Sequence, residues 1–189
     1  MSDGDTLAYL RRVTRPAHDS LEGALGLLDE HLDLAAYRDI LQRFHGFWQA
    51  WEPHVAELLH ADAAFLLARR RLHLLQADLA VLGMSADAVA ALPACPLPVL
   101  ADAAEALGSL YVMEGSTLGG RVISRNVERR LGFDGQAGCR YFMGYGAETG
   151  PMWRSFLVRL DEEPPAHAER VGNGATATFE RLAWWLTRR

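Results

Sequence analysis

The sequence predicts an all-α protein, and three observations support this prediction. Apolar residues recur at spacings of three and four through most of the chain, as on one face of a helix. Half of the 189 residues are hydrophobic and 23% are charged, which is typical of a folded chain with a core. No segment shows the alternation expected of a strand. Because this length suits one domain, we predict that residues 1–189 form a single-domain multi-helix bundle.

The N-terminal half is expected to hold five helices, each bounded by a capping residue or a breaker. The expected ranges are 6–14, 14–28, 33–60, 63–82 and 85–92. Thr14 is the expected cap of the second helix, where Pro16 suits a first turn. Pro93, Pro96 and Pro98 then predict a loop.

Three further helices are expected in the C-terminal half. Asp102 and Glu105 resemble a capping box at the start of a long helix that ends at Gly132. Residues 133–148 are expected to be a loop. A helix then begins at Thr149 and is broken by Pro164 and Pro165, after which the last helix follows.

The long helix carries glycines where a helix does not favour them. Gly108, Gly115, Gly119 and Gly120 lie in its interior, and each costs about 1 kcal/mol relative to alanine. Gly115 and Gly119 share one helical face, with Gly120 beside them. Such a face admits a large flat group against the backbone, or else a closely packed helix.

Composition excludes several other classes of function. The net charge of −5 gives no argument for nucleic-acid binding, and every basic residue is an arginine. The spacing of Cys95 and Cys139 matches no metal motif, so a reducing cytoplasm is the simplest location. The N-terminus is too polar for a signal peptide, and no apolar run reaches membrane-spanning length.

Among seven histidines, His18 is distinguished by Glu22 one helical turn later. A metal-binding imidazole commonly has its second nitrogen held by a carboxylate, although such a pair is also common on solvated helix faces. His45, among aromatic residues, is expected to be a satisfied interior histidine, and His73 to follow a solvated run, Arg69–Arg71. A single axial histidine suits a haem, because the porphyrin supplies four further ligands.

Three motifs together resemble a known family. They are TRPAHDSLE at residues 14–22, YVMEGSTLGG at 111–120, and GYG with TGPMW at 144–146 and 149–153. In this order they are similar to the biliverdin-producing haem oxygenases, in particular bacterial ones associated with phytochromes. The resemblance covers about residues 6–186. It implies a bundle with haem between an N-terminal proximal helix and a kinked, glycine-rich distal helix.

The resemblance also implies residue roles. His18 is then the iron ligand and Glu22 its partner. Gly115, Gly119 and Gly120 are the glycines over the haem face, where missing side chains leave room for O2. Basic residues near the propionates and further pocket residues would be Arg11, Arg15, Arg154, Tyr111 and Phe179. Solvated charge remains open for the three arginines, as does core packing for Phe179 and Tyr111.

One residue departs from the pattern of the animal-type enzymes. Ser116 stands where they carry an aspartate that orders water near the bound oxygen, and a hydroxyl holds water less firmly. The resemblance implies haem cleavage to biliverdin, CO and Fe²⁺ with O2. Electrons would come from a ferredoxin or flavodoxin type of donor, or from ascorbate, because no flavin or nicotinamide motif is present. A phytochrome is a possible recipient of biliverdin.

Two alternatives stay open at this point. Ser116 favours a haem-binding carrier or sensor that has kept the pocket without efficient turnover. A thiaminase-like small-molecule site on the same helical fold would need a catalytic cysteine in the core, whereas Cys95 and Cys139 fall in expected loops.

Overall fold

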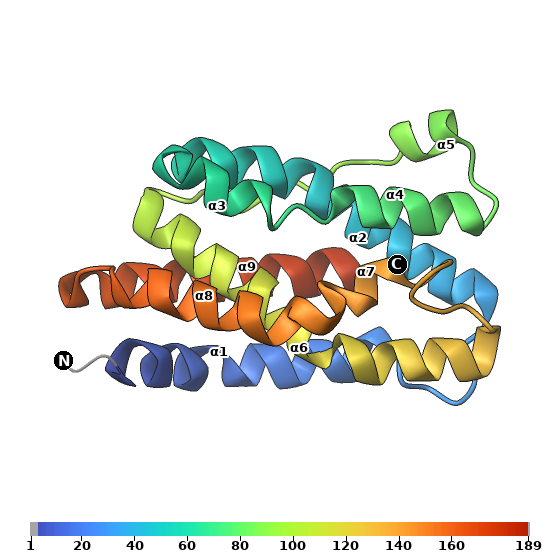
Figure 1. Cartoon of the computed structure of the whole chain (residues 1–189), viewed down its shortest axis with the longest axis horizontal. Helices are drawn as coiled ribbons and strands as arrows, with labels where there is room; N and C mark the ends of the chain where they lie inside the picture. Colours follow the sequence, from blue (N-terminus) through green and yellow to red (C-terminus); the bar gives the residue numbers. More distant parts are fainter. Residues whose placement is uncertain (1–3, 189) are drawn as a thin grey trace.

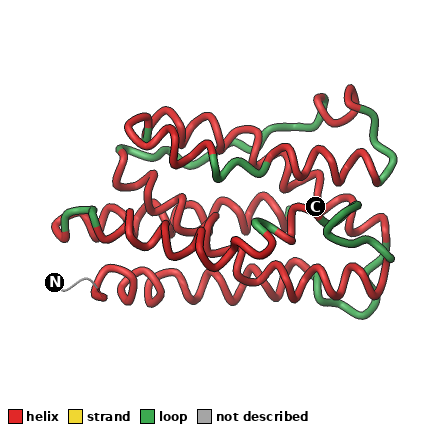
Figure 2. Tube along the Cα trace, in the orientation of Figure 1, coloured by secondary structure: helices red, strands yellow, loops and turns green. Residues whose placement is uncertain are grey.

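The computed structural model describes residues 4–188, apart from the side chains of Asp5 and Glu22. Helices make up most of this range, and its one sheet-like feature is an isolated bridge between Asp134 and Gly138 (Figure 2). The predicted all-α class is therefore confirmed. Within the described range, no helix is both long and apolar enough to cross a membrane.

Nine α-helices are described between residues 4 and 188 (Figure 1). Their bounds are α1 Gly4–Leu25, α2 Leu34–Leu58, α3 Ala63–Leu67, α4 Leu72–Val81, α5 Ala86–Ala90, α6 Ala103–Leu131, α7 Arg140–Met143, α8 Thr149–Asp161 and α9 Ala168–Thr187. The α6–α9 contact is the most extensive, and the α1–α9 contact is the next. In Figure 1 the first half of α6 runs obliquely, and its second half turns to run in about the same direction as α1.

Two glycines account for the close crossing of α6 and α9. A Cβ atom on Gly108 of α6 would lie 1.8 Å from the carbonyl oxygen of Val171. A Cβ on Gly174 of α9 would lie 1.9 Å from the carbonyl oxygen of Glu105. Since no side chain fits at either position, these glycines let the two backbones touch. Gly108 is thus a helix-packing glycine.

The ends of α6 confirm the predicted boundaries. The Asp102 carboxylate accepts hydrogen bonds from the backbone N–H groups of Ala104 and Glu105. In return, the Glu105 carboxylate accepts one from the N–H of Ala101, so both acidic side chains satisfy donors at the helix start. Gly132 ends the helix with a φ of 73°, in the left-handed region that favours glycine.

The predicted division of the first helix at Thr14 is wrong. Helix α1 is continuous from Gly4 to Leu25 and includes Pro16. The Thr14 hydroxyl donates to the Leu10 carbonyl oxygen, 2.8 Å away, which is a bond made within a helix and not a cap. Proline removes one N–H from the ladder, and packing of α1 against α9 maintains the helix across this position.

The predicted helix over 63–82 is divided into α3 and α4. A carboxylate from α2 explains the break. Glu52 Oε1 accepts from the backbone N–H groups of Arg71, at 2.7 Å, and Leu72, at 2.8 Å. These donors begin α4 and would otherwise lack partners within the helix. Since the cap comes from another helix, the local sequence carries no signal of it.

The predicted loop over 133–148 contains the short helix α7. The fully buried carboxylate of Asp78 in α4 accepts from the backbone N–H groups of Arg140, at 2.9 Å, and Tyr141, at 2.8 Å. Here too, a carboxylate distant in sequence satisfies the first donors of a helix.

Candidate functional site

A cavity of about 470 Å³ lies between α1 and the middle of α6, within the range of about 300–1,000 Å³ usual for ligand sites. Residues of α7, α8 and α9 close its sides. The two main walls are formed by Arg11, Thr14, Arg15, His18, Leu21 and Leu25 of α1 and by Tyr111, Val112, Met113, Gly115, Ser116, Thr117, Leu118, Gly119 and Ile123 of α6.

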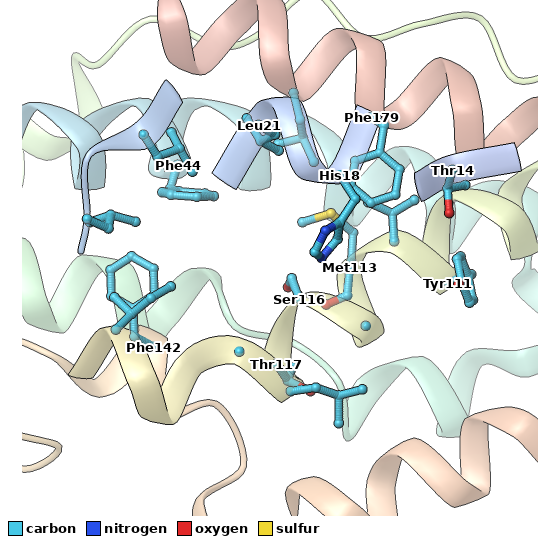
Figure 3. A pocket seen from close by; sticks show the side chains of 18 of the residues that line it. Thr14, His18, Leu21, Phe44, Tyr111, Met113, Ser116, Thr117, Phe142 and Phe179 are labelled. Carbon is cyan, nitrogen blue, oxygen red and sulfur yellow. Dashed lines mark hydrogen bonds between the residues drawn. The ribbon is translucent and has the colours of Figure 1, made fainter. Parts of the chain in front are cut away.

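His18 points from α1 into this cavity. Figure 3 shows its ring directed across the space toward Ser116 on α6, with the ring of Phe179 beside it. The two rings meet edge to face, with centroids 6.0 Å apart. The side chain is half-exposed, and Nδ1 lies 3.6 Å from Oδ1 of Asp19. The side chain of Glu22, the predicted partner of His18, lies outside the described residues.

Gly115 and Gly119 both line the cavity on the α6 side. A Cβ on Gly119 would meet nothing within 4 Å, and one on Gly115 would meet only the Trp153 ring, at 3.9 Å. These glycines therefore present open backbone to the cavity. The prediction for Gly120 is corrected, because a Cβ there would lie 1.8 Å from the carbonyl oxygen of Phe142. Gly120 packs against α7 and does not line the cavity.

Two of the three predicted arginines lie at the cavity. Arg11 and Arg15 line it and have exposed side chains, so their positive charge borders the opening. Arg154 is exposed and is not part of the lining, contrary to the placement that the resemblance implied. Its neighbour Trp153 faces the cavity instead, because consecutive residues of a helix point in different directions.

Tyr111 and Phe179 serve both the cavity and the core. Each is less than 10% exposed and lines the cavity. The Tyr111 ring packs against those of Trp153 and Phe156, at centroid distances of 5.9 and 6.4 Å. Burial raises the pKa of Tyr111, and the Thr14 hydroxyl and the nearby Arg11 charge partly oppose this increase.

Ser116 is held by a residue that the sequence did not single out. Its hydroxyl donates to the Met113 carbonyl oxygen at 2.7 Å and accepts from Nη2 of Arg71 at 3.2 Å. The predicted solvation of Arg69–Arg71 is wrong at both ends of the run, because Arg69 and Arg71 are 5% and 2% exposed. The break between α3 and α4 turns these two side chains inward.

A buried cluster of Arg69, Glu114 and Tyr145 lies next to Arg71. Oε2 of Glu114 is 3.5 Å from Nε of Arg69, and the Tyr145 hydroxyl donates to Oε1 of Glu114 at 2.5 Å. Burial raises the pKa of Glu114, and the hydrogen bond from Tyr145 and the two arginine charges oppose this. The sequence offered no signal for this cluster, because its members come from three separate segments.

The remaining predicted candidates lie away from the cavity. Cys95 and Cys139 are buried, and burial raises the pKa of each thiol to about 11. Neither lines the cavity, so the thiaminase-like alternative lacks its nucleophile there. His45 is buried as expected. However, neither ring nitrogen has a hydrogen-bond partner in the described part of the chain, so it is not the satisfied histidine that was predicted.

Comparisons with known proteins identify the family. The family model described as "Heme oxygenase" matches residues 5–188. The chain belongs to the haem oxygenase family. A curated "Heme oxygenase" from Xanthomonas campestris pv. campestris (strain 8004) is 34% identical over 152 residues, which is 79% of this chain and 87% of that protein.

A solved structure shares the fold. It is that of the NO- and CO-bound heme oxygenase from Neisseria meningitidis, with a TM-score of 0.79 and 22% identity. The match covers 96% of this chain and 89% of the solved chain.

Membership of this family sets the class of reaction. Haem oxygenases are oxidoreductases that bind haem and O2, require an electron donor and produce biliverdin. The alternative of a carrier or sensor is not favoured, because both the family model and the curated relative are haem oxygenases.

Proposed function

We propose that haem lies between α1 and α6, with His18 as its iron ligand, and that this chain opens the ring to biliverdin, CO and Fe²⁺. The observation that carries the proposal is the open backbone of Gly115 and Gly119 on the wall that faces His18. A flat macrocycle between these walls would cover the apolar side chains and leave His18 on one face. One axial histidine is the ligand set of many haem proteins.

Each wall has a distinct task under this proposal. Haem iron supplies the oxygen chemistry when bound, while the protein binds and orients the substrate and controls proton access. Arg11 and Arg15 at the opening would pair with the propionates, and Phe179 would fix the orientation of the His18 ring. Ser116 would hold a proton-carrying water on the opposite wall, because a hydroxyl both donates and accepts.

The proposal extends to the electron donor, the fate of biliverdin and the cellular location. Electrons would come from a ferredoxin or flavodoxin type of donor, or from ascorbate in the test tube. Biliverdin would pass to a bacterial phytochrome, and the protein would act in the cytoplasm. The match to one family over residues 5–188 supports a single domain over residues 1–189.

The test is a turnover assay on the ferric haem complex with ascorbate in air. We expect loss of the haem absorption band, a product that absorbs in the red and is identified as biliverdin by mass, and release of CO. Ser116→Ala should slow product formation while leaving haem affinity nearly unchanged. If the wild-type protein keeps haem intact for hours under these conditions, the carrier alternative replaces the enzyme.

A further inference from the structure

Arg71 places a buried positive charge at the wall of the cavity. Its side chain is among the most deeply buried large side chains of the described chain and also lines the cavity. Nη2 donates to the Met113 carbonyl oxygen at 2.6 Å and to Ser116 Oγ at 3.2 Å. Nε has no hydrogen-bond partner among residues 4–188. This nitrogen is itself buried, so Arg71 acts on the cavity through its positive charge and through its hydrogen bond to Ser116.

The charge of Arg71 is only partly compensated by its surroundings. The guanidinium carbon lies 4.6, 5.3 and 5.8 Å from the ring centroids of Trp48, Tyr141 and Tyr145, contacts that stabilise a cation modestly. The carboxylate of Glu114 lies 3.5 Å from Arg69 and also interacts electrostatically with Arg71, at least as strongly as with Arg69, so one carboxylate serves two arginines. A buried cation without an ion pair is unfavourable, so a negative group in the cavity would stabilise it.

Glu52 fixes the position from which Arg71 reaches the cavity. Its carboxylate accepts the N–H groups of Arg71 and Leu72 at the start of α4. Arg71 is therefore held at both ends. Its backbone N–H is bound by Glu52, and its guanidinium is bound by the Met113 carbonyl oxygen and by Ser116. A side chain held at both ends loses little further freedom when it binds a ligand.

We propose that Arg71 is an anion-binding residue of this cavity, which together with Ser116 recognises small anions on the haem face opposite His18. Glu52 is the positioning residue that fixes Arg71. The inference rests on the proposed function, since it takes His18 as the ligand on the other face. Animal-type enzymes carry an aspartate at the position of Ser116. In this chain, the same wall carries the positive charge of Arg71 instead.

The test compares an anionic with a neutral ligand of the haem complex. Fluoride binding to the ferric form and CO binding to the ferrous form are titrated by absorption for the wild type, Arg71→Met, Arg71→Lys and Glu52→Gln. Arg70→Met is the matched control, because Arg70 is the adjacent arginine and is exposed. Losing a charged donor should weaken fluoride binding about tenfold or more in Arg71→Met and change CO affinity less than twofold.

The other variants should differ in fluoride affinity in a defined order. Arg71→Lys should retain part of the fluoride affinity, Glu52→Gln should lose less than Arg71→Met, and Arg70→Met should match the wild type. If Arg71→Met does not fold, Ser116→Ala provides the same comparison, with fluoride affinity lowered and CO affinity retained. Equal losses for fluoride and CO, or no loss for fluoride, would overturn the inference. Wild-type protein without a His18-dependent haem spectrum would instead overturn the proposed function.

Discussion

Gly119 and Gly120 are neighbours in α6 but face different surroundings. Gly119 opens onto the cavity, whereas Gly120 touches the backbone of α7 at Phe142. Consecutive helical residues are about 100° apart around the axis, so both glycines cannot face the same ligand. We assign Gly119 to the proposed haem site and Gly120 to helix packing, and this difference can be measured.

Gly119→Leu should retain the fold and impair haem oxidation. The new side chain enters open space and improves helix propensity by up to about 1 kcal/mol, so the unfolding temperature should stay the same or rise. In the cavity it should compete with haem or O2, and biliverdin formation should slow. Gly120→Ala should do the reverse and destabilise by about 1–3 kcal/mol. Equal effects on unfolding would contradict this assignment.

His45 should make stability fall in mildly acidic solution. Burial lowers its pKa below the ordinary value of 6.5. Above pH 6.5 the His45 ring is neutral in both the folded and the unfolded state. Below pH 6.5 the unfolded state takes up a proton before the folded state does, so the free energy of unfolding falls as the pH falls. His45→Leu should reduce this loss between pH 7.5 and 5 in thermal unfolding. The exposed His73→Gln is the control, and identical pH profiles for wild type and His45→Leu would refute the prediction.

At the scale of elements, two carboxylates, the fully buried one of Asp78 and the partly buried one of Glu52, set helix starts far from themselves in sequence. Glu52 of α2 caps α4, and Asp78 of α4 caps α7. These caps position two parts of the cavity wall, the Arg71 side chain and the rings of Tyr141 and Phe142. Local patterns cannot show such caps, which is why the α3–α4 break and α7 were not predicted.

Asp78→Ala should destabilise the protein and loosen this wall. The substitution leaves the buried N–H of Tyr141 and the partly buried N–H of Arg140 without an acceptor, at a cost of about 1–3 kcal/mol. Asp134→Ala is the matched control, because Asp134 also accepts two backbone N–H groups but in an exposed turn. Urea unfolding should show the larger loss for Asp78→Ala. A loss no larger than that of the control would argue against a structural role for the buried cap.

At the scale of the whole molecule, the sequence predicted the parts that depend on local chemistry. The all-α class and both ends of α6 follow from helix periodicity and caps at Asp102 and Gly132. The convergence of His18 and Gly119 on one cavity agrees with the predicted haem position. Arg71 was missed because its burial depends on tertiary contacts, since a run of three arginines is locally typical of a solvated surface.

We propose that haem lies between α1 and α6 with His18 on its iron. The most direct test is the absorption spectrum of the ferric haem complex of His18→Ala, recorded before and after imidazole is added. The variant should still bind haem through the remaining cavity contacts but lose the histidine-ligated spectrum and most turnover. Added imidazole should partly restore both. A spectrum identical to that of the wild type would contradict the claim and assign the ligand to another residue.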